Sequence, residues 1–587
     1  MKRFKYSLLA SSMALLGVGM SAGSFAATYE IVDLTEQSNS SRQSFGMAVN
    51  NEGVALGNLT ELFNYPINIE RLNIDVIEVA LTDAQATQPG VYDDVTIADI
   101  EAGNLNANAT AFLRSYLIGA WQNRDTQKVG DRASFKYDAT GYSEVTMFDE
   151  VQEGFGGKTR STTDIPYAIN DNGVIVGAGT DVYRFRTYSP APTEETPEPE
   201  DLTFWRTSFV ERMGLVIRGD ERVPIVSEYD NFGGSTVLTD ISNNNYVVGY
   251  AAVQVSRDGS LGIDNVCPDE EDEDRKVQCG WQVKNNIAAQ ANGQTFYRYR
   301  GYRWKLNEDL EIVETKNLGL MFESDNTESI SYFSAVAGVN EQGNMAAYSH
   351  GYRNFPENSG GIRTMATFHD GESYKSIVDQ DTYFSSRSTD INDSNIVVGF
   401  AARAVNSTST NQMFYYDHNT GETVYPEGFF DSSVSEPAAI NNANQIVGTA
   451  QVQTDLIQNR RSAGFIYDIS AQTMTNLNDL TACNSPYRVV EANDINDDGV
   501  IVGTALLSVT QTDALGEAVL DDNGDPVIEQ VARAVKLLPI AGGSIDDCTD
   551  DGNSGAGAVT YERKGANFGL LSLLLLGGIY YRRKLIG

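Results

Sequence analysis

The sequence predicts an all-β protein, a β-propeller of seven four-stranded blades, and three observations support this fold class. A nine-residue pattern recurs seven times, an aromatic-rich hairpin follows most copies, and the segment before the first copy resembles a strand that the last repeat lacks. Composition agrees, because 53 Gly, 29 Tyr and 41% hydrophobic residues suit many short strands joined by tight turns.

The nine-residue pattern reads INDNGVIVG from Ile169 and INDDGVIVG from Ile495. Its second position is Asn in six copies and Ser242 in the third, and such side chains accept backbone N–H groups in tight turns. Its fifth position is always Gly or Asn, the residues that best tolerate positive φ in a hairpin loop. Mostly β-branched residues follow and predict a buried strand. The seven predicted turn residues are Gly53, Gly173, Asn245, Gly343, Asn395, Asn444 and Gly499.

A second hairpin follows most copies, as in FYYDHNTGETVYP from Phe414 and FIYDISAQTMTNL from Phe465. Two hairpins make four antiparallel strands, which is one propeller blade. The last three copies are spaced by 52, 49 and 55 residues, close to the ~40–50 residues of a blade.

The N-terminal segment is expected to close the ring. The seventh repeat ends after the strand ARAVKLL from Ala532, without a fourth strand, whereas TYEIVDL from Thr28 resembles the fourth strand of other repeats. An N-terminal strand that completes the last blade would remove the exposed sheet edges. A linear array of blades and two separate sandwiches are the alternatives.

Three insertions interrupt the propeller, which is assigned to residues 27–541. They cover about 60–130, with helical periodicity over 94–121, then the Pro/Glu-rich loop 189–201, and the acidic segment 258–280. We expect these insertions to lie on one rim of the disc, because function in such scaffolds concentrates in loops.

Residues 1–26 are typical of a secretory signal. Basic residues near Lys2 precede an apolar stretch over 8–20, and Ser24 and Ala26 provide the small residues that signal peptidase requires. Cleavage after Ala26 is therefore predicted, with an uncleaved anchor as the alternative.

The C-terminus predicts a stalk over 542–565 and a hydrophobic tail over 566–587. The apolar run 568–581 is shorter than the ~17–25 residues of a stable span, and basic residues from Arg582 follow it. This tail resembles the GlyGly-type C-terminal sorting signal of Gram-negative bacteria, with Lys564-Gly565 in place of Gly-Gly. The resemblance implies removal by a rhomboid-like protease and release to the cell surface or medium. A permanent membrane anchor is the alternative.

Four cysteines in an exported chain favour disulfides. Of three pairings, Cys267–Cys279 would clip the acidic loop and Cys483–Cys548 would tie the last repeat to the following segment. No C-x-x-C motif is present and the three histidines lie far from the cysteines in sequence, so a metal site is not predicted.

Charge and motifs limit the function. A net charge of −38 excludes nucleic acid as an expected partner, and no local catalytic constellation is found. The stretch 494–499 (DINDDG) matches the first half of a Ca²⁺ loop, but Ala505 stands where the bidentate Glu would be, and residues 521–525 form another oxygen-rich turn. We therefore expect no cofactor, and a bound calcium ion is the alternative.

The motif INxxGxVVG resembles the HAF-type repeat of bacterial extracellular proteins, and the whole chain resembles the secreted family of domain of unknown function 3466. This resemblance implies a repetitive exported β protein and carries no functional residues, since the family has no assigned activity. We therefore expect a non-enzymatic surface or secreted protein that binds a glycan, envelope component or protein. The alternatives are a secreted enzyme acting on an extracellular polymer in the propeller channel, and a membrane-anchored structural or assembly factor.

Overall fold

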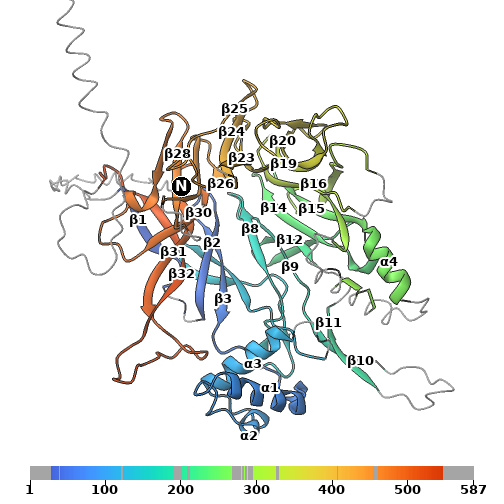
Figure 1. The fold of residues 1–587 in the computed structure, drawn as a ribbon, viewed down its shortest axis with the longest axis vertical. Helices are drawn as coiled ribbons and strands as arrows, with labels where there is room; N and C mark the ends of the chain where they lie inside the picture. The colour runs from blue at the N-terminus through green and yellow to red at the C-terminus, as the bar shows by residue number, and fades with distance from the viewer. Residues whose placement is uncertain are drawn as a thin grey trace, which may run out of the picture.

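Seven four-stranded antiparallel sheets stand in a ring in the computed structural model (Figure 1). The fold is a seven-bladed β-propeller, as the repeats predict. The structure describes residues 28–545 apart from 37, 39, 121–122, 124, 189–200, 208–211, 230, 268–278, 281–282, 285–286, 288–294, 325–329, 406 and 455–459.

The first six blades each use four strands in sequence order, and the first strands of neighbouring blades contact one another around the axis. Blades 1–3 comprise β2 (Ser41–Val49), β3 (Ala55–Leu62), β4 (Arg132–Asp138) and β5 (Gly141–Val145); β8 (Ile165–Ile169), β9 (Ile175–Gly179), β12 (Met213–Arg218) and β13 (Glu221–Ile225); and β14 (Thr236–Ile241), β15 (Tyr246–Val255), β16 (Tyr297–Leu306) and β17 (Ile312–Asn317). Blades 4–6 comprise β18 (Ser334–Val339), β19 (Met345–Tyr352), β20 (Ile362–His369) and β21 (Tyr374–Ser376); β22 (Ser385–Ile391), β23 (Ile396–Val405), β24 (Thr408–Asp417) and β25 (Glu422–Val424); and β26 (Ser435–Ile440), β27 (Gln445–Gln451), β28 (Ser462–Asp468) and β29 (Thr473–Asn476).

Blade 7 contains both ends of the propeller. Its strands are β30 (Arg488–Ile495), β31 (Ile501–Thr510), β32 (Ile528–Pro539) and, outermost, β1 (Tyr29–Asp33). β1 runs antiparallel to β32 from Tyr29 opposite Pro539 to Asp33 opposite Val535. The predicted closure by the N-terminal strand is confirmed, and the linear array and the paired sandwiches are wrong.

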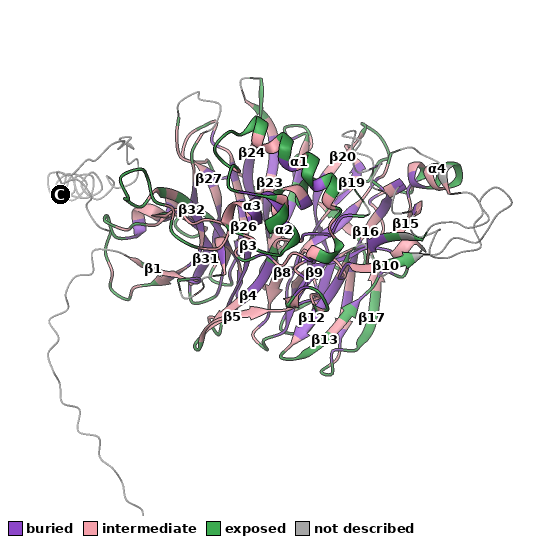
Figure 2. Ribbon diagram, turned by 90° about the horizontal axis from the view of Figure 1, so that it is seen from below, coloured by how far each residue is buried: buried purple, intermediate pink, exposed green. Residues whose placement is uncertain are grey.

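The hydrophobic core lies between neighbouring blades. Val176 and Val216 of blade 2 pack with Val247 of blade 3, for example, and all three side chains are fully buried. Figure 2 shows buried residues concentrated in the strands and exposed residues on the helices and outer edges. Each blade therefore depends on its neighbours for much of its buried surface.

The insertions form small elements of their own. The helical insertion carries a separate core that includes Ile77, Leu81 and Phe112, and it begins earlier than the periodicity over 94–121 indicates. The elements are η1 (Ile69–Arg71), α1 (Ile74–Thr87), α2 (Ile97–Glu101) and α3 (Ala107–Gly119) between β3 and β4; β6 (Val151–Gln152) and β7 (Gly157–Lys158) between β5 and β8; β10 (Arg184–Tyr188) and β11 (Leu202–Arg206) between β9 and β12; η2 (Asn231–Gly233) before β14; α4 (Arg257–Val266) between β15 and β16; and η3 (Leu477–Leu480) after β29.

All of these insertions connect a second strand to a third or a fourth strand to the next blade. Because successive strands run in opposite directions, such connections leave the disc on one side, whereas the turns between first and second strands lie on the other. We call the side with the seven predicted turn residues the turn face, and the side with α1–α4, β6–β7 and β10–β11 the insertion face. Within the described residues no helix is long and apolar enough to cross a membrane.

Candidate functional site

The seven predicted turn residues occupy equivalent positions. Each has a positive φ, between 57° at Asn245 and 79° at Gly343, and each lies in the turn that joins the first two strands of its blade. This backbone conformation explains why only Gly and Asn appear at the position.

The second position of each repeat links neighbouring blades. Asn50 Oδ1 accepts the N–H of Val54 within its turn at 2.9 Å, and its Nδ2 donates to the carbonyl of Asn170 in the next blade at 3.0 Å. The inter-blade bond recurs from six of the seven blades at 3.0–3.1 Å. Ser242 accepts the N–H of Tyr246 within its turn at 3.2 Å, and its side chain makes no inter-blade bond to a described residue.

The third position forms a closed ring. In every blade its backbone N–H donates to a side-chain oxygen of the next blade at 2.7–2.9 Å, and the bond from Asp497 to Asn51 joins the last blade to the first. We call this set the turn ring: Asn51, Asp171, Asn243, Glu341, Asp393, Asn442 and Asp497.

Three aspartates stand one residue before the repeat in alternate blades. Asp390 shows their role, because its carboxylate accepts the N–H of Ile391 at 2.7 Å and the N–H of Ile440 in the next blade at 2.8 Å. Asp240 and Asp494 repeat this bridge. Three carboxylates thus accept six of the seven equivalent N–H groups.

These aspartates are poor candidates for a catalytic pair, because their oxygens already bind backbone. Burial raises the pKa of Asp240 to about 7 and that of Asp494 to about 6. Burial and the negative charge of Asp240 also raise the pKa of Asp390. The turn face is therefore a hydrogen-bonded clamp that holds the ring closed.

A pocket of about 610 Å³ opens on the insertion face between blades 4 and 5. The end of β19, the start of β20 and the start of β22 position its walls. Among the described residues none that lines the pocket is acidic, although the chain has 80 Asp and Glu residues. The lining residues are Ile330, Tyr332, His350, Tyr352, Gly361, Ile362, Arg363, Thr364, Phe384 and Ser385.

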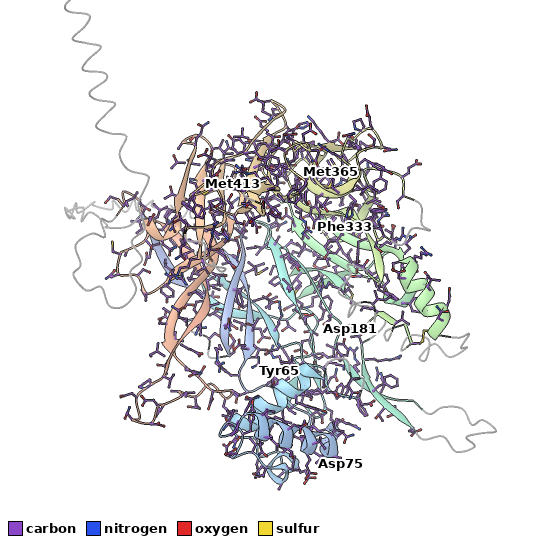
Figure 3. The ribbon with its side chains drawn as sticks, viewed as in Figure 1. Tyr65, Asp75, Asp181, Phe333, Met365 and Met413 are labelled. Carbon is purple, nitrogen blue, oxygen red and sulfur yellow. A yellow bond between two sulfur atoms is a disulfide. The ribbon has the colours of Figure 1, made fainter. Side chains whose placement is uncertain are left out.

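Aromatic rings support one wall of this pocket. His350 lies with its ring centre 4.6 Å from that of Phe333 and 5.6 Å from that of Tyr332. Phe322 continues the cluster, 5.1 Å from Tyr332 and 5.2 Å from Tyr352. Figure 3 labels Phe333, which directly precedes β18. Edge-to-face packing of this kind fixes the ring orientations.

The imidazole of His350 is neutral. Its Nδ1 accepts the N–H of Phe333 at 2.9 Å, so the proton of the neutral ring is on Nε2. Burial lowers the pKa of His350, and the positive charges of Arg387 and Arg300 lower it further. The pocket thus offers a neutral N–H donor among aromatic rings.

Arg363 lines the pocket and Arg300 and Arg387 lie near it, and none of the three has a carboxylate partner in the described part of the chain. Arg363 donates to the carbonyls of Gln380 and Tyr383, at 3.2 and 3.4 Å. Arg300 donates to the carbonyls of Tyr299 and Tyr332, at 2.8 and 2.9 Å. Neither makes an ion pair with a described residue.

The third arginine lies on β22. Arg387 is exposed, and its guanidinium lies 5.4 Å from the ring centre of Tyr348, without an ion pair to any described residue. Carbonyls and rings orient these groups without neutralising their charge.

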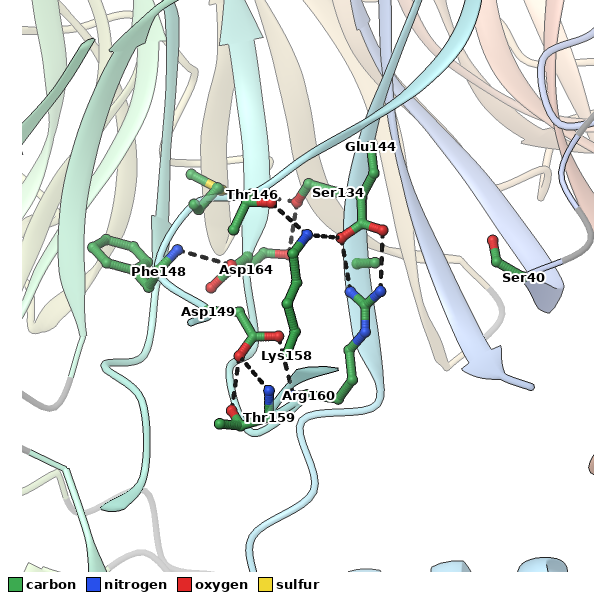
Figure 4. Close-up of polar contacts among 12 residues, drawn as sticks. Ser40, Ser134, Glu144, Thr146, Phe148, Asp149, Lys158, Thr159, Arg160 and Asp164 are labelled. Carbon is green, nitrogen blue, oxygen red and sulfur yellow. Dashed lines mark hydrogen bonds and ion pairs between the residues drawn. The ribbon is translucent and has the colours of Figure 1, made fainter. Parts of the chain in front are cut away.

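The loop between β5 and β8 shows the opposite arrangement (Figure 4). Arg160 makes a bidentate pair with Glu144 at 2.8 and 3.0 Å, and Lys158 binds the same carboxylate at 2.7 Å. Asp149 accepts three bonds from Thr159 and Arg160. These charges are satisfied within the protein, so this cluster is structural.

The chain matches the family model described as "Protein of unknown function (DUF3466)" over residues 4–584, which is nearly its whole length. The chain belongs to the DUF3466 family. No curated protein matches it.

Several solved structures are similar to this DUF3466 protein at low identity. An oligogalacturonate lyase in complex with manganese is 10% identical with a TM-score of 0.32, covering 70% of this chain and 84% of that one. The polysaccharide lyase Uly1 is 12% identical with a TM-score of 0.32, covering 70% and 85%. The β-propeller domain of the Trilobed protease from Pyrococcus furiosus is 7% identical with a TM-score of 0.30, covering 68% and 89%.

The cysteines of the DUF3466 protein partly fall within the described residues. Cys267 and Cys279 form a disulfide with a Cα–Cα distance of 5.6 Å, so the predicted clip after α4 is confirmed. Cys483 is also disulfide-bonded, while Cys548 lies outside the described residues, as do Ala26, the sorting tail and most of the Pro/Glu-rich loop.

The two oxygen-rich turns use their oxygens internally. Asp494 bridges two blades, Asp497 belongs to the turn ring, and Asp521 Oδ1 accepts the N–H groups of Asn523 and Asp525 at 2.8 and 3.0 Å. In the part of the chain that the structure describes, no group of three or more His, Cys, Asp or Glu could hold a metal ion. The calcium hypothesis gains no support.

The other two histidines are packed into blades. His369 Nδ1 accepts the N–H of Gly371 at 2.9 Å, and His418 stacks on Phe368 at 3.9 Å. Sequence reasoning missed the pocket, because its residues lie outside the repeat motif and come from four separate segments.

Proposed function

We propose that this protein is an exported, non-enzymatic binding platform, and that its insertion face holds an extracellular saccharide in the pocket between blades 4 and 5. The observation that carries the proposal is the composition of that pocket. It combines aromatic surface at Tyr352 and Phe384 with a cation at Arg363 and opens to solvent. Specific ligand sites typically combine apolar walls with a few polar groups.

Export is supported by three features of the chain. The basic and apolar pattern of residues 1–26 is typical of a secretory signal, and the tail over 566–587 resembles a bacterial sorting signal. The Cys267–Cys279 disulfide fits an oxidising compartment. Signal peptidase and a rhomboid-like protease would then process the two ends, leaving the propeller at the cell surface or in the medium.

Processing is tested by mass spectrometry of the native protein from its host. We expect the N-terminus at residue 27 and the loss of the tail that contains Arg582. A mature protein that retains Arg582 would instead support permanent anchoring and the assembly-factor alternative. An N-terminus at Met1 would contradict export by a cleaved signal.

Binding without turnover agrees with the chemistry of the lining residues. The lining residues that the structure describes include no carboxylate, so they provide no pair of carboxylates for general acid–base catalysis. The presence of His350 is the observation that favours the second candidate, a polymer-cleaving enzyme, because histidine is a frequent general acid–base residue. To act as a base, His350 would have to release the bond that its Nδ1 accepts from the N–H of Phe333.

A retention experiment separates the two candidates. The protein is immobilised and exposed to neutral and anionic polysaccharides, and both the amount retained and the chain length are measured. We expect retention at unchanged length, and its loss in a Tyr352→Ala/Phe384→Ala variant. Val313→Ala, at a 61% exposed position on β17, is the control. Shortened polymer would favour the enzyme, and absence of retention would contradict the binding platform.

A further inference from the structure

We infer that the ligand of the pocket between blades 4 and 5 is an oligosaccharide that carries carboxylate groups, such as a chain of uronic acids. This inference rests on the proposed function and specifies its ligand class. It depends on Arg363, which lines the pocket, on Arg300, which binds the carbonyl of the lining residue Tyr332, and on Arg387, which follows the lining residue Ser385 on β22.

No described carboxylate neutralises the positive charge of these arginines. Each comes from a different strand of three successive blades: Arg300 from β16, Arg363 from β20 and Arg387 from β22. Arg300 and Arg363 are half-buried and bind only backbone carbonyls, and none of the three has a carboxylate partner among the described residues.

The surroundings of these arginines differ from those of the paired cations in the molecule, although Arg222 also binds only carbonyls, those of Thr146 and Asp220. The chain has 80 acidic and 42 basic residues, and Lys158 and Arg160 share one carboxylate. Half-buried guanidinium groups without counter-charge are costly, and an anionic ligand would supply the missing charge. The planar guanidinium also matches a carboxylate in a bidentate geometry.

Hydroxyl groups favour a saccharide over an acidic peptide. The side-chain hydroxyls of Thr364, Ser385 and Tyr352 line the pocket and make no hydrogen bond with another described residue. They can exchange bonds with the many hydroxyls of a sugar. The rings of Tyr352 and Phe384, the latter 44% exposed, offer flat apolar surface for the C–H faces of a pyranose.

The test measures equilibrium binding of the full mature protein to a panel of hexasaccharides of mannuronate, galacturonate and glucuronate. Their methyl esters keep the sugar ring and remove the charge, and poly-L-glutamate represents an acidic peptide. We expect at least one uronate to bind, its ester to bind at least about tenfold more weakly, and added salt to weaken the acid form.

Variants assign the effect to the pocket. Arg363→Gln is expected to weaken uronate binding about ten- to one-hundredfold, and Arg363→Lys should recover part of the loss. Arg218→Gln is the matched control, because Arg218 ends the third strand of its blade, β12, on the opposite face, and pairs with Glu221 at 2.9 Å. Thermal unfolding of each variant establishes that it is folded.

Three results would overturn the inference, and they also distinguish it from the proposed function. Equal binding of acid and ester would exclude recognition of the carboxylate while leaving a saccharide platform intact. Arg363-dependent binding of poly-L-glutamate without any uronate would identify an acidic peptide as the ligand. Failure of every saccharide, acid or ester, would contradict both the inference and the binding platform.

Discussion

The two faces of this propeller differ in how they use polar residues. On the turn face, the polar side chains of the repeat bind backbone groups of the next blade, and the turn ring closes without a gap. On the insertion face, no described carboxylate neutralises the guanidinium groups of Arg363 and Arg387. The hydroxyl groups of Thr364, Ser385 and Tyr352 make no hydrogen bond with another described residue. The polar groups of the turn face therefore stabilise the closed ring, whereas these arginines of the insertion face have no carboxylate partner among the described residues.

The largest expected effect comes from opening the ring. Removal of residues 28–34 deletes β1 and the fully buried Leu34, leaving β32 as an exposed edge. We expect loss of the cooperative thermal transition and aggregation, because an unpaired edge templates intermolecular pairing. Circular dichroism and size-exclusion chromatography measure both. Deletion of the exposed loop 521–525 is the control, and a cooperative transition in the 28–34 deletion would contradict strand closure.

A methyl group at the final glycine of the repeat is the next test. A Cβ on Gly249 would lie 1.9 Å from the carbonyl oxygen of Val237, whereas blade 4 naturally has Ala347 there. We expect Gly249→Ala to lower the free energy of unfolding by about 2–3 kcal/mol, and Ala347→Gly by about 1 kcal/mol or less. Urea denaturation compares them. Equal effects would show that the blades tolerate this position alike.

The side-chain amide that bonds one blade to the next can be removed at one repeat and added at another. Asn392→Ser keeps the bond to Ile396 N–H but loses the bond to the carbonyl of Asn441, so we expect a cost of about 1–2 kcal/mol. Ser242→Asn should gain about 0.5–1.5 kcal/mol by restoring the bond that blade 3 lacks. Urea denaturation measures both, and destabilisation by Ser242→Asn would show that blades 3 and 4 are spaced differently.

The three aspartates predict a pH dependence of stability. Burial raises the pKa of Asp240 to about 7, above the ~3.9 of an unfolded Asp, so the folded state binds more protons between these values. This contribution is full below about pH 4 and is lost as pH rises through about 7.

The measurement compares Tm at pH 5 and pH 7.5. From pH 5 to pH 7.5, we expect the Tm of the wild type to fall by about 2–5 °C more than that of Asp240→Asn, because the variant has no titrating group at this position. The negative charge of Glu341 also raises the pKa of Asp240, so Glu341→Gln is the control. We expect the pH dependence of its Tm to differ from that of the wild type by less than the pH dependence of Asp240→Asn does. Equal pH dependence in Asp240→Asn would contradict the raised pKa.

The smallest effect on stability is expected on the insertion face. Phe384 is 44% exposed, so Phe384→Ala should change the free energy of unfolding by less than about 0.5 kcal/mol while weakening ligand retention. Thermal unfolding and the retention assay measure the two properties on one sample. A large loss of stability would mean that the pocket rim is part of the core.

Much of the fold could be predicted because its signals are local and repeated. The Gly or Asn at each turn follows from the positive φ that the hairpin requires, and the missing last strand pointed to the segment at Tyr29. The Cys267–Cys279 disulfide could also be predicted, because the two cysteines are only 12 positions apart in the sequence. The first helix, α1, was missed although Ile74, Ile77, Leu81 and Ala84 give it an apolar face at helical spacing.

The candidate site could not be predicted in the same way. His350 on β19, Arg363 on β20 and Phe384 just before β22 come from different segments of two blades and share no motif or spacing. The bridging aspartates were also missed, because only the ring places the second N–H donor of Asp390 in the following blade.

By itself, the sequence determined the number of blades, the turn geometry and the strand that closes the ring, because each depends on backbone conformation and short-range pattern. Only the tertiary structure decided which polar groups are neutralised and which remain open, because that depends on distances between residues far apart in the chain. Asn51 and Asp497 illustrate this limit: they lie 446 positions apart in the sequence, and two hydrogen bonds join them.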